Sequence, residues 1–307
     1  MTIHYVEPST TTLHGPFSKD RKPILTIQSG DTIRYKTLDA GWGLEPFLDG
    51  PPRRRFEPAE PGHALCGPVE VVGAKSGMVL EVHVNRIVPG EWGWTCAGGF
   101  AHPVNQSLGL DDGEELYLNW ELDSKTMIGT NQFGHQVALR PFMGVMGMPP
   151  SEAGMHSTSP PRFCGGNIDC KELVEGSTLY LPIAVDGALF SVGDGHAVQG
   201  DGEVSVTAIE CPMDLVDLTL SVREDLLLSM PRATTPIGHI TFGFHEDLNE
   251  ATTMALEGML QWMGELHGLD RRMALALASL TVDLRVTQIV NGVRGVHAVL
   301  PYGAFKL

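Results

Sequence analysis

The stretch Phe190–Glu210 reads FSVGDGHAVQGDGEVSVTAIE. At both of its ends apolar residues alternate with small or polar ones, as in β-strands, and glycines divide its middle into turns. It carries five ionisable side chains, at Asp194, His196, Asp201, Glu203 and Glu210. The pattern predicts a β-rich fold in which a turn between strands collects acids and an imidazole.

A divalent metal site is the first function that this turn suggests. Asp194 and His196 are two residues apart, so in an extended strand their side chains point to the same face. Upstream, Asp169 follows a Gly-Gly pair in GGNIDC and would complete an open three-ligand site. The alternative is a glycine-rich turn in which the acid binds backbone N–H groups and the imidazole is exposed.

A general base is the second requirement of metal-assisted hydrolysis. Glu203, two residues after Asp201 in QGDGE, is the favoured acid/base, although an exposed turn would have the same composition. Glu210 competes with it. If EVSVTAIE were a strand, Glu210 would continue an apolar face, where a carboxylate is unlikely to serve solubility. Spacing does not rank the two glutamates.

Four longer stretches carry a family resemblance. They are residues 67–94 (GPVEVVGAKSGMVLEVHVNRIVPGEWGW), 141–150 (PFMGVMGMPP), 165–210 and 282–301 (VDLRVTQIVNGVRGVHAVLP). The chain resembles the acetamidase/formamidase family from about residue 24 to its C-terminus. The resemblance implies a cytoplasmic, oligomeric and β-rich amidohydrolase of small aliphatic amides that uses a divalent metal.

The resemblance adds Asp39 and His63 as further candidate metal ligands, since the family has an acid and a histidine near these positions. For His63, a hydrogen-bonded structural role is an equally good interpretation. Two features depart from the family pattern. Cys164 stands where a histidine is common, and the segment from Leu44 to Glu60 fits no recognised pattern. Both features could influence the choice of substrate.

Residues Gly165, Gly166 and Asn167 are candidates for stabilising the oxyanion that forms when water adds to an amide carbonyl. The two glycines could equally serve only to permit a tight turn. A cysteine nucleophile at Cys164 or Cys170 is a weaker alternative, because it needs a neighbouring base or positive charge to lower the thiol pKa.

Composition limits the class of protein. The 307 residues carry a formal charge of −16, which argues against a nucleic-acid partner. Five cysteines without a C-x-x-C pair fit a reducing compartment. We see no secretion signal and no apolar run long enough to cross a membrane. These features predict a cytoplasmic protein, and the resemblance predicts a homo-oligomer.

Two units are expected along the chain. Residues 1–245 read as short strands and turns, which predicts a mainly β catalytic unit, sandwich-like or barrel-like, of one or two subdomains. Residues 246–307 predict a smaller α+β unit of two helices and a strand that packs on it. Asp247 and Asp270 are predicted to cap the N-termini of the two helices, and Gly268 is predicted to end the first helix.

The leading hypothesis is a metal-dependent amidohydrolase that cleaves the C–N bond of a small linear carboxamide. Zinc is favoured over calcium or manganese, because carboxylate and imidazole ligands in an open site suit it. One alternative is a metal-dependent lyase or isomerase on a β scaffold. Another is a non-enzymatic β-sandwich that binds calcium or carbohydrate through the acidic turn.

Overall fold

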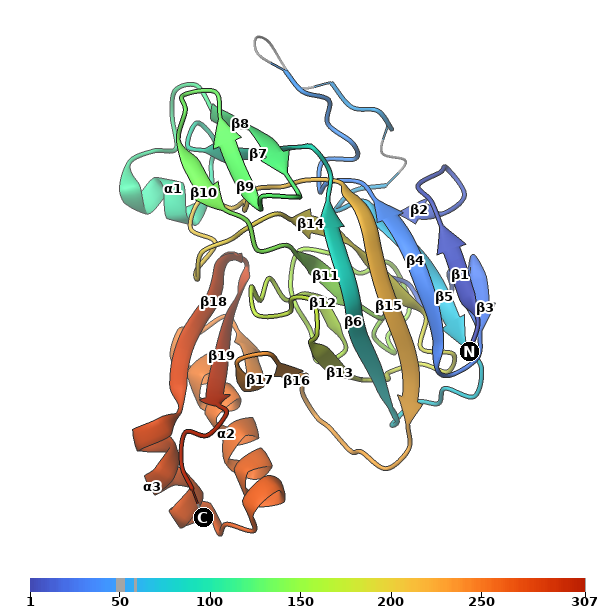
Figure 1. The fold of residues 1–307 in the computed structure, drawn as a ribbon, viewed down its shortest axis with the longest axis vertical. Helices are drawn as coiled ribbons and strands as arrows, with labels where there is room; N and C mark the ends of the chain where they lie inside the picture. Colours follow the sequence, from blue (N-terminus) through green and yellow to red (C-terminus); the bar gives the residue numbers. More distant parts are fainter. Residues whose placement is uncertain (48–52, 58–59, 307) are drawn as a thin grey trace.

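The computed structural model describes residues 1–47, 53–57 and 60–306 (Figure 1). The segment from Leu44 to Glu60 therefore lies partly outside the described residues. The largest sheet has nine strands in the order β1-β4-β15-β6-β13-β16-β17-β19-β18. Their bounds are Ile3–Val6, Asp31–Thr37, Met213–Arg223, Val79–Pro89, Thr178–Pro182, Arg232–Thr235, Gly238–His245, Val293–Pro301 and Asp283–Asn291.

A second sheet packs against this one. Its order is β12-β11-β14-β5-β2, with β3 paired to β5. The bounds are Gly165–Asn167, Phe142–Gly147, Phe190–His196, Leu65–Val71, Leu13–His14 and Leu25–Ile27. Apolar side chains of both sheets share one core, for example Ile33 and Val84 of the first with Val69 and Val192 of the second. The fold is thus a β-sandwich with further elements, which confirms the mainly β class.

A third, four-stranded sheet lies at the end of the molecule opposite the helices α2 (Leu248–His267) and α3 (Arg271–Thr281) (Figure 1). It has the order β10-β9-β8-β7. The strands span Gln136–Ala138, Ile128–Asn131, Leu116–Asp123 and Trp92–Ala97, and the short helix α1 spans Pro103–Leu108. Its inner edge reaches the acidic segment singled out in the sequence, because Trp94 of β7 forms a backbone bridge with Glu210.

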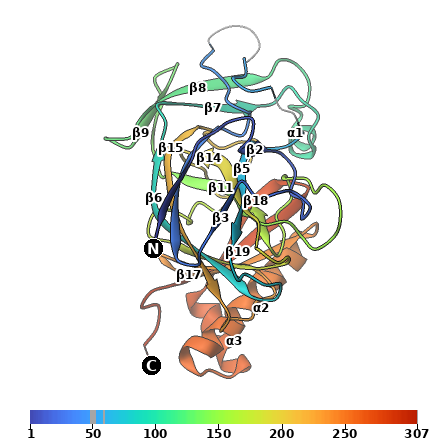
Figure 2. The same cartoon turned by 90° about the vertical axis from the view of Figure 1, so that its right-hand side faces the viewer.

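The C-terminal helices begin and end where the sequence predicts. Asp247 and Asp270 accept hydrogen bonds from the first turns of α2 (Leu248–His267) and α3 (Arg271–Thr281), and Gly268 ends α2 in the left-handed region. These helices pack on β19 around a core of their own. They extend away from the other two sheets (Figure 2).

The domain boundary at residue 245 stays a prediction. β17 lies before it and β19 after it, and the two strands pair along their length in the nine-stranded sheet. Two helices and two strands follow residue 245, rather than the two helices and one strand expected. No helix among the described residues is long and apolar enough to cross a membrane.

Two expectations about local structure were wrong. The segment 203–209 is not a strand, since Glu203 and Val206 have φ of 45° and 78° and Val204 is exposed. The sequence Ser29-Gly30-Asp31, which lies between two alternating runs, also predicts a hairpin, and this hairpin is absent from the described structure. β3 pairs with β5, whereas β4 pairs with β1 and β15 in the other sheet. The alternation of apolar and polar residues identified β3 and β4 as strands, but it did not reveal which strands they pair with.

Candidate active site

Two adjacent strands bring the first candidate residues together. β11 and β14 are antiparallel, with Met143 opposite Gly195 and Val145 opposite Gly193, so Gly144 faces Asp194. His196 ends β14, where its ring packs edge-on against Phe142. On the other side of β11, β12 leads into Asp169. The N–H group of Asp169 donates to the carbonyl of Gly144 at 3.3 Å.

His196 lies at the centre of the site and is fully buried. Its Nε2 is 3.3 Å from Asp194 Oδ1 and 3.3 Å from Glu210 Oε1, yet neither contact has hydrogen-bond geometry. Ligands placed tetrahedrally at about 2.0–2.1 Å from a metal are about 3.3–3.4 Å from one another. The two distances from Nε2 therefore fit ligands of a shared metal ion better than they fit hydrogen bonds.

A second group of converging ligand atoms comprises Asp169, His196 and Glu203. Asn291 Nδ2 donates to Asp169 Oδ2 at 2.7 Å, which leaves Oδ1 free to face the site. Gln199 links the two groups, since its side chain bonds His196 Nδ1 at 2.9 Å and the Asp169 carbonyl at 2.9 Å. Because Nδ1 is occupied, Nε2 is the ring nitrogen available to a metal.

The backbone is strained at three of the four acids. Asp169, Asp194 and Glu203 have φ of 54°, 60° and 45°, values that non-glycine residues rarely adopt. Such conformations persist only when surrounding structure enforces them, and they are enriched at functional sites. At Asp194 the unusual φ occurs within a β-strand, so strand geometry alone does not set the direction of this side chain.

The acids perturb one another electrostatically. Burial raises the pKa of Asp169 to about 8 and that of Glu210 to about 7. Burial and the charge of Asp169 raise the pKa of Glu203 well above its usual value. Burial also disfavours a charged His196, but Glu210 and Asp194 outweigh it and raise its pKa well above the ordinary one. The pocket thus strongly favours positive charge near Nε2.

The donor set fits a divalent cation. Among the described residues, His196 Nε2, Asp169 Oδ1, Glu203 Oε2 and Glu210 Oε2 are buried without a hydrogen-bond partner. Four buried carboxylates beside one imidazole are unfavourable without compensating positive charge. Carboxylate and imidazole ligands suit zinc.

Gly144 makes room for this cluster. A Cβ at Gly144 would lie 2.7 Å from Asp169 Oδ1 and 2.9 Å from His196 Cε1, and closer still to Asp194 Oδ2. Only a glycine therefore allows these three side chains to gather against β11. The sequence alone does not reveal a role for Gly144, although this residue lies in the motif PFMGVMGMPP.

A cavity of about 280 Å³ opens onto three of the acids. Its lining includes His63, Trp94, Asn167, Asp194, Glu203, Glu210 and Asn291. His63 Nδ1 is held at 2.8 Å from Thr158 Oγ1. Among the described residues, His63 and Asp39 belong to neither group of converging ligands. His63 borders the cavity instead.

Asp39 is buried and organises the cavity rim. Its carboxylate accepts hydrogen bonds from the indole N–H of Trp94 at 2.7 Å and from the backbone N–H groups of Gly43 and Leu44 at 2.6 and 3.0 Å. These bonds saturate the carboxylate, so we infer that Asp39 fixes Trp94 and the 41–44 loop rather than a metal.

The candidate oxyanion residues occupy different environments. The N–H of Gly165 donates to the carbonyl of Arg162 at 3.0 Å and is not free for a substrate. Gly165 and Gly166 have φ of 89° and 108°, so glycine is needed at both for the backbone of β12 itself. Asn167 lines the cavity, and its Oδ1 makes no hydrogen bond within the described structure.

The remaining candidates are Asp201 and two cysteines, whose thiol pKa is raised rather than lowered. Asp201 is exposed to solvent and pairs with Lys171 at 2.8 Å. All five cysteines are free and buried. Burial raises the pKa of Cys164 to about 11 and that of Cys170 well above its ordinary value. A thiolate nucleophile at neutral pH is therefore disfavoured.

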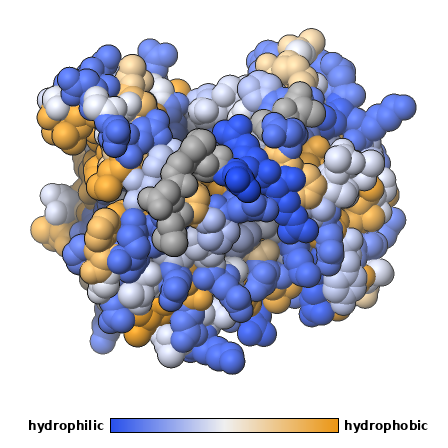
Figure 3. Space-filling view, turned by 90° about the horizontal axis from the view of Figure 1, so that it is seen from above, coloured by the Kyte–Doolittle hydropathy of each residue, from blue (hydrophilic) through white to orange (hydrophobic). Residues whose placement is uncertain are grey.

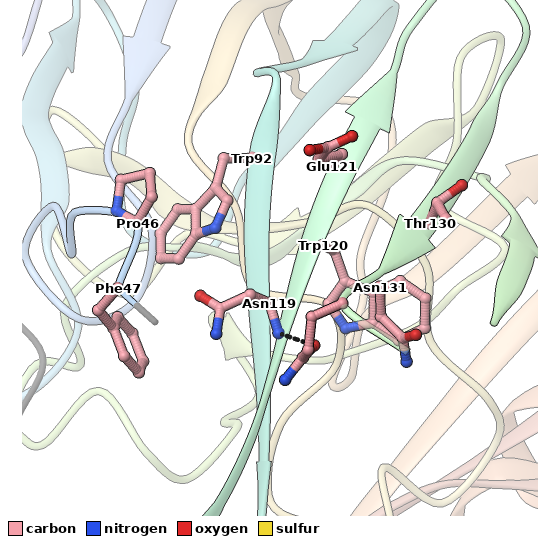
Figure 4. Close-up of a pocket in the computed structure, with 9 residues that line it drawn as sticks. Pro46, Phe47, Trp92, Asn119, Trp120, Glu121, Thr130 and Asn131 are labelled. Atoms are coloured by element: carbon pink, nitrogen blue, oxygen red, sulfur yellow. Dashed lines mark hydrogen bonds between the residues drawn. The ribbon is translucent and has the colours of Figure 1, made fainter. Parts of the chain in front are cut away.

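Trp92 and Trp94 line different cavities. Trp94 borders the acidic site, whereas Trp92 lies with Pro46 and Phe47 in a larger outer cavity of about 540 Å³ (Figure 4). There the backbone N–H of Asn119 donates a hydrogen bond to the side-chain oxygen of Gln132 at 2.8 Å. From this end of the molecule, hydrophilic and hydrophobic residues are interspersed around a central hydrophilic group (Figure 3).

Comparisons with known proteins agree with this architecture. The profile of the Acetamidase/Formamidase family matches residues 4–159 and 152–307. The chain is 27% identical over 242 residues to the formamidase of Methylophilus methylotrophus, an alignment that covers 63% of this chain and 60% of that protein. With the acetamidase of Mycolicibacterium smegmatis it shares 28% identity over 251 residues, 62% of this chain and 61% of that one.

The alignments thus span about 60% of the length of these curated relatives. A crystal structure of an acetamidase from Bacillus halodurans superposes with a TM-score of 0.83 and 27% identity, over 97% of both chains. Since the family profile covers nearly every residue and the fold agrees over nearly the whole length, this chain belongs to the acetamidase/formamidase family.

Proposed function

We propose that this protein hydrolyses the C–N bond of small linear carboxamides of the formamide or acetamide type to a carboxylate and ammonia. The observation that carries the proposal is the convergence of Asp194, His196 and Glu210 beside a further buried acid, Glu203, with these three acids lining one cavity. The family and the names of the relatives, formamidase and acetamidase, support the same chemistry.

Asp194, His196 and Glu210 are the ligands that we propose for a divalent metal, zinc by preference, with Asp169 close by. The sequence predicted Asp169, Asp194 and His196 as ligands. Glu210 replaces Asp169 in this set, because Glu210 Oε1 lies 3.3 Å from His196 Nε2. A metal bound there would polarise an amide carbonyl and lower the pKa of water to about 7.

Glu203 is the proposed acid/base. It is buried, lines the cavity and keeps Oε2 free of hydrogen bonds to described residues. It would take a proton from the attacking water and return it to the nitrogen, because an amine leaves poorly unless it is protonated. Its raised pKa favours this return step.

Asn167 and the walls of the cavity are proposed to orient the amide. Asn167 carries both a donor and an acceptor, so it can bind a carbonyl oxygen or an amide N–H. The volume of about 280 Å³ lies just below the roughly 300–1,000 Å³ of pockets for drug-sized ligands. Small amides are therefore the expected substrates.

Metal analysis combined with an ammonia-release assay tests this function. The assay would compare formamide, acetamide, propionamide and a cyclic imide. We expect bound zinc, release of ammonia from the linear amides and loss of activity after chelation, with recovery on adding zinc. Full activity after verified metal removal would refute the mechanism, and inactivity of metal-loaded protein on every linear amide would refute the substrate class.

We further propose that the protein acts as a homo-oligomer in the cytoplasm. Five free cysteines support a reducing compartment. Light scattering of the purified protein would give its mass, and a monomer at micromolar concentration would contradict the oligomer. The lyase and calcium-binding alternatives are less favoured, because the acids are buried side chains that line one cavity and the family is one of amidases.

A further inference from the structure

A second cluster of ligand-type side chains lies outside the acidic site. It comprises Cys170, Glu172 and His297, all fully buried. Glu172 Oε2 is 3.4 Å from Cys170 Sγ and 3.3 Å from His297 Nε2. One sulfur, one oxygen and one nitrogen thus face a common point, contributed by the turn after β12 and by strand β19.

The outer atoms of the cluster are held in place. Thr287 Oγ1 bonds His297 Nδ1 at 2.7 Å, so Nε2 is the ring nitrogen that points into the cluster. Arg285 binds Glu172 Oε1 at 3.1 Å, so Oε2 is the oxygen that points inward. Partners of this kind orient the ligands in metal sites.

Hydrogen bonding alone does not satisfy this cluster. A thiol proton from Cys170 can reach Glu172 Oε2, which accounts for the sulfur. His297 Nε2 is fully buried, and among the described residues it has no hydrogen-bond partner, because its approach to Glu172 lacks the required geometry. A buried polar atom in this state is costly. A ligand that approaches along the lone pair of His297 Nε2 would remove this cost.

We propose that Cys170, Glu172 and His297 form a second metal site, distinct from the acidic site, for a thiophilic divalent cation such as zinc. A thiolate, an imidazole and a carboxylate suit zinc and disfavour magnesium or calcium. On binding, the cation takes the sulfur electron pair and the thiol proton leaves to solvent, so one proton is released per ion bound.

The site would join distant parts of the chain. Cys170 directly follows Asp169 of the acidic site, whereas Thr287 and His297 belong to β18 and β19. The N–H of Gly202, next to Glu203, donates to the carbonyl of Thr287 at 3.0 Å. A cation bound here would therefore brace the loops that carry Asp169 and Glu203 without contacting substrate.

Cobalt substitution provides a test that does not depend on activity. Full-length protein stripped of metal and reloaded with Co²⁺ should bind about two ions per chain and show a thiolate-to-cobalt charge-transfer absorption. Cys170→Ser should abolish that absorption and lower the stoichiometry to about one. Cys164→Ser, another buried cysteine, is the matched control and should retain both.

Two further variants separate the sites. His297→Gln should also lower the number of bound Co²⁺ ions to about one per chain. This variant replaces Cys170→Ser as the test if Cys170→Ser does not fold. His196→Ala should lose the other ion and keep the charge-transfer absorption, so failure of the acidic site and failure of this one are distinguishable. Wild-type protein without the absorption, or an absorption that persists in Cys170→Ser, would overturn the proposal.

Discussion

Replacing Gly144 by alanine would force a methyl group against the buried acids. The new Cβ would lie 2.7 Å from Asp169 Oδ1, whereas ordinary contact begins at 3.4 Å, and Asp194 Oδ2 is nearer still. The side chains must therefore move by about 0.7 Å or more. Asp194 has little freedom to do so, because its backbone is already strained at a φ of 60°.

Active-site groups work only within about 0.5 Å of their productive geometry. A displacement of about 1 Å can cost about 100-fold in rate, which corresponds to a barrier higher by about 3 kcal/mol. We therefore expect Gly144→Ala to lower metal affinity and to reduce kcat/KM by about 100-fold. Overpacking of about 1–3 kcal/mol should lower the Tm by a few degrees while the fold survives.

Metal content, ammonia release and thermal melting would be measured on this variant and on Gly200→Ala. Gly200 is the matched control, because a Cβ there meets nothing within 4 Å and no unusual φ is required. The control should behave like the wild type. A Gly144→Ala protein with full metal content and unchanged kcat/KM would refute the crowding described here.

Four other outcomes are expected. Glu203→Gln should keep its metal and lose about 10²- to 10⁴-fold in kcat, because the amide cannot accept a proton; normal turnover would show that Glu203 is not the acid/base. Glu210→Gln should instead lose metal. If Glu210→Gln keeps its metal but is inactive, Glu210 is the acid/base and Glu203 is not. A thiol-blocking reagent applied to native protein should leave activity intact, since burial raises the pKa of thiols such as Cys164 to about 11; rapid inactivation would contradict this. Hydrogen bonds, led by that from the N–H of Thr2, lower the pKa of Asp31, so its stabilising effect is present above the ordinary aspartate pKa and is lost as the pH falls through the lowered value. Asp31→Asn should therefore lower the urea midpoint at neutral pH, with a gap to the wild type that narrows in acid; a gap independent of pH would refute it.

Local signals predicted part of this structure well. The capping residues Asp247, Gly268 and Asp270 bound the two long helices as expected, because capping depends on neighbouring residues. The mainly β class followed from alternation. Alternation failed at 203–209, where positive φ angles at Glu203 and Val206 replace a strand by turns. Composition does not reveal such angles in non-glycine residues.

The acids that lie around His196 in the structure are among those singled out in the sequence. They are Asp169, Asp194, Glu203 and Glu210. The sequence did not reveal the residues that position them. Gln199 and Asn291 are ordinary amides in sequence, and Asn291 meets Asp169 only because β18 returns beside the site. A contact between residues so far apart depends on strand order, which single-sequence patterns do not encode.

The bond between Asn291 and Asp169 has a consequence for how the protein is made. The two residues are 122 positions apart. At about 5–20 residues per second on the ribosome, Asp169 is synthesised about 6–25 s before the amide that will hold it. From the synthesis of Glu210 until that of β18, the nascent chain contains every acid of the cluster and lacks the strand that braces them. A productive metal centre is therefore a late event in biosynthesis, and a ribosome stalled before β18 carries an incomplete enzyme.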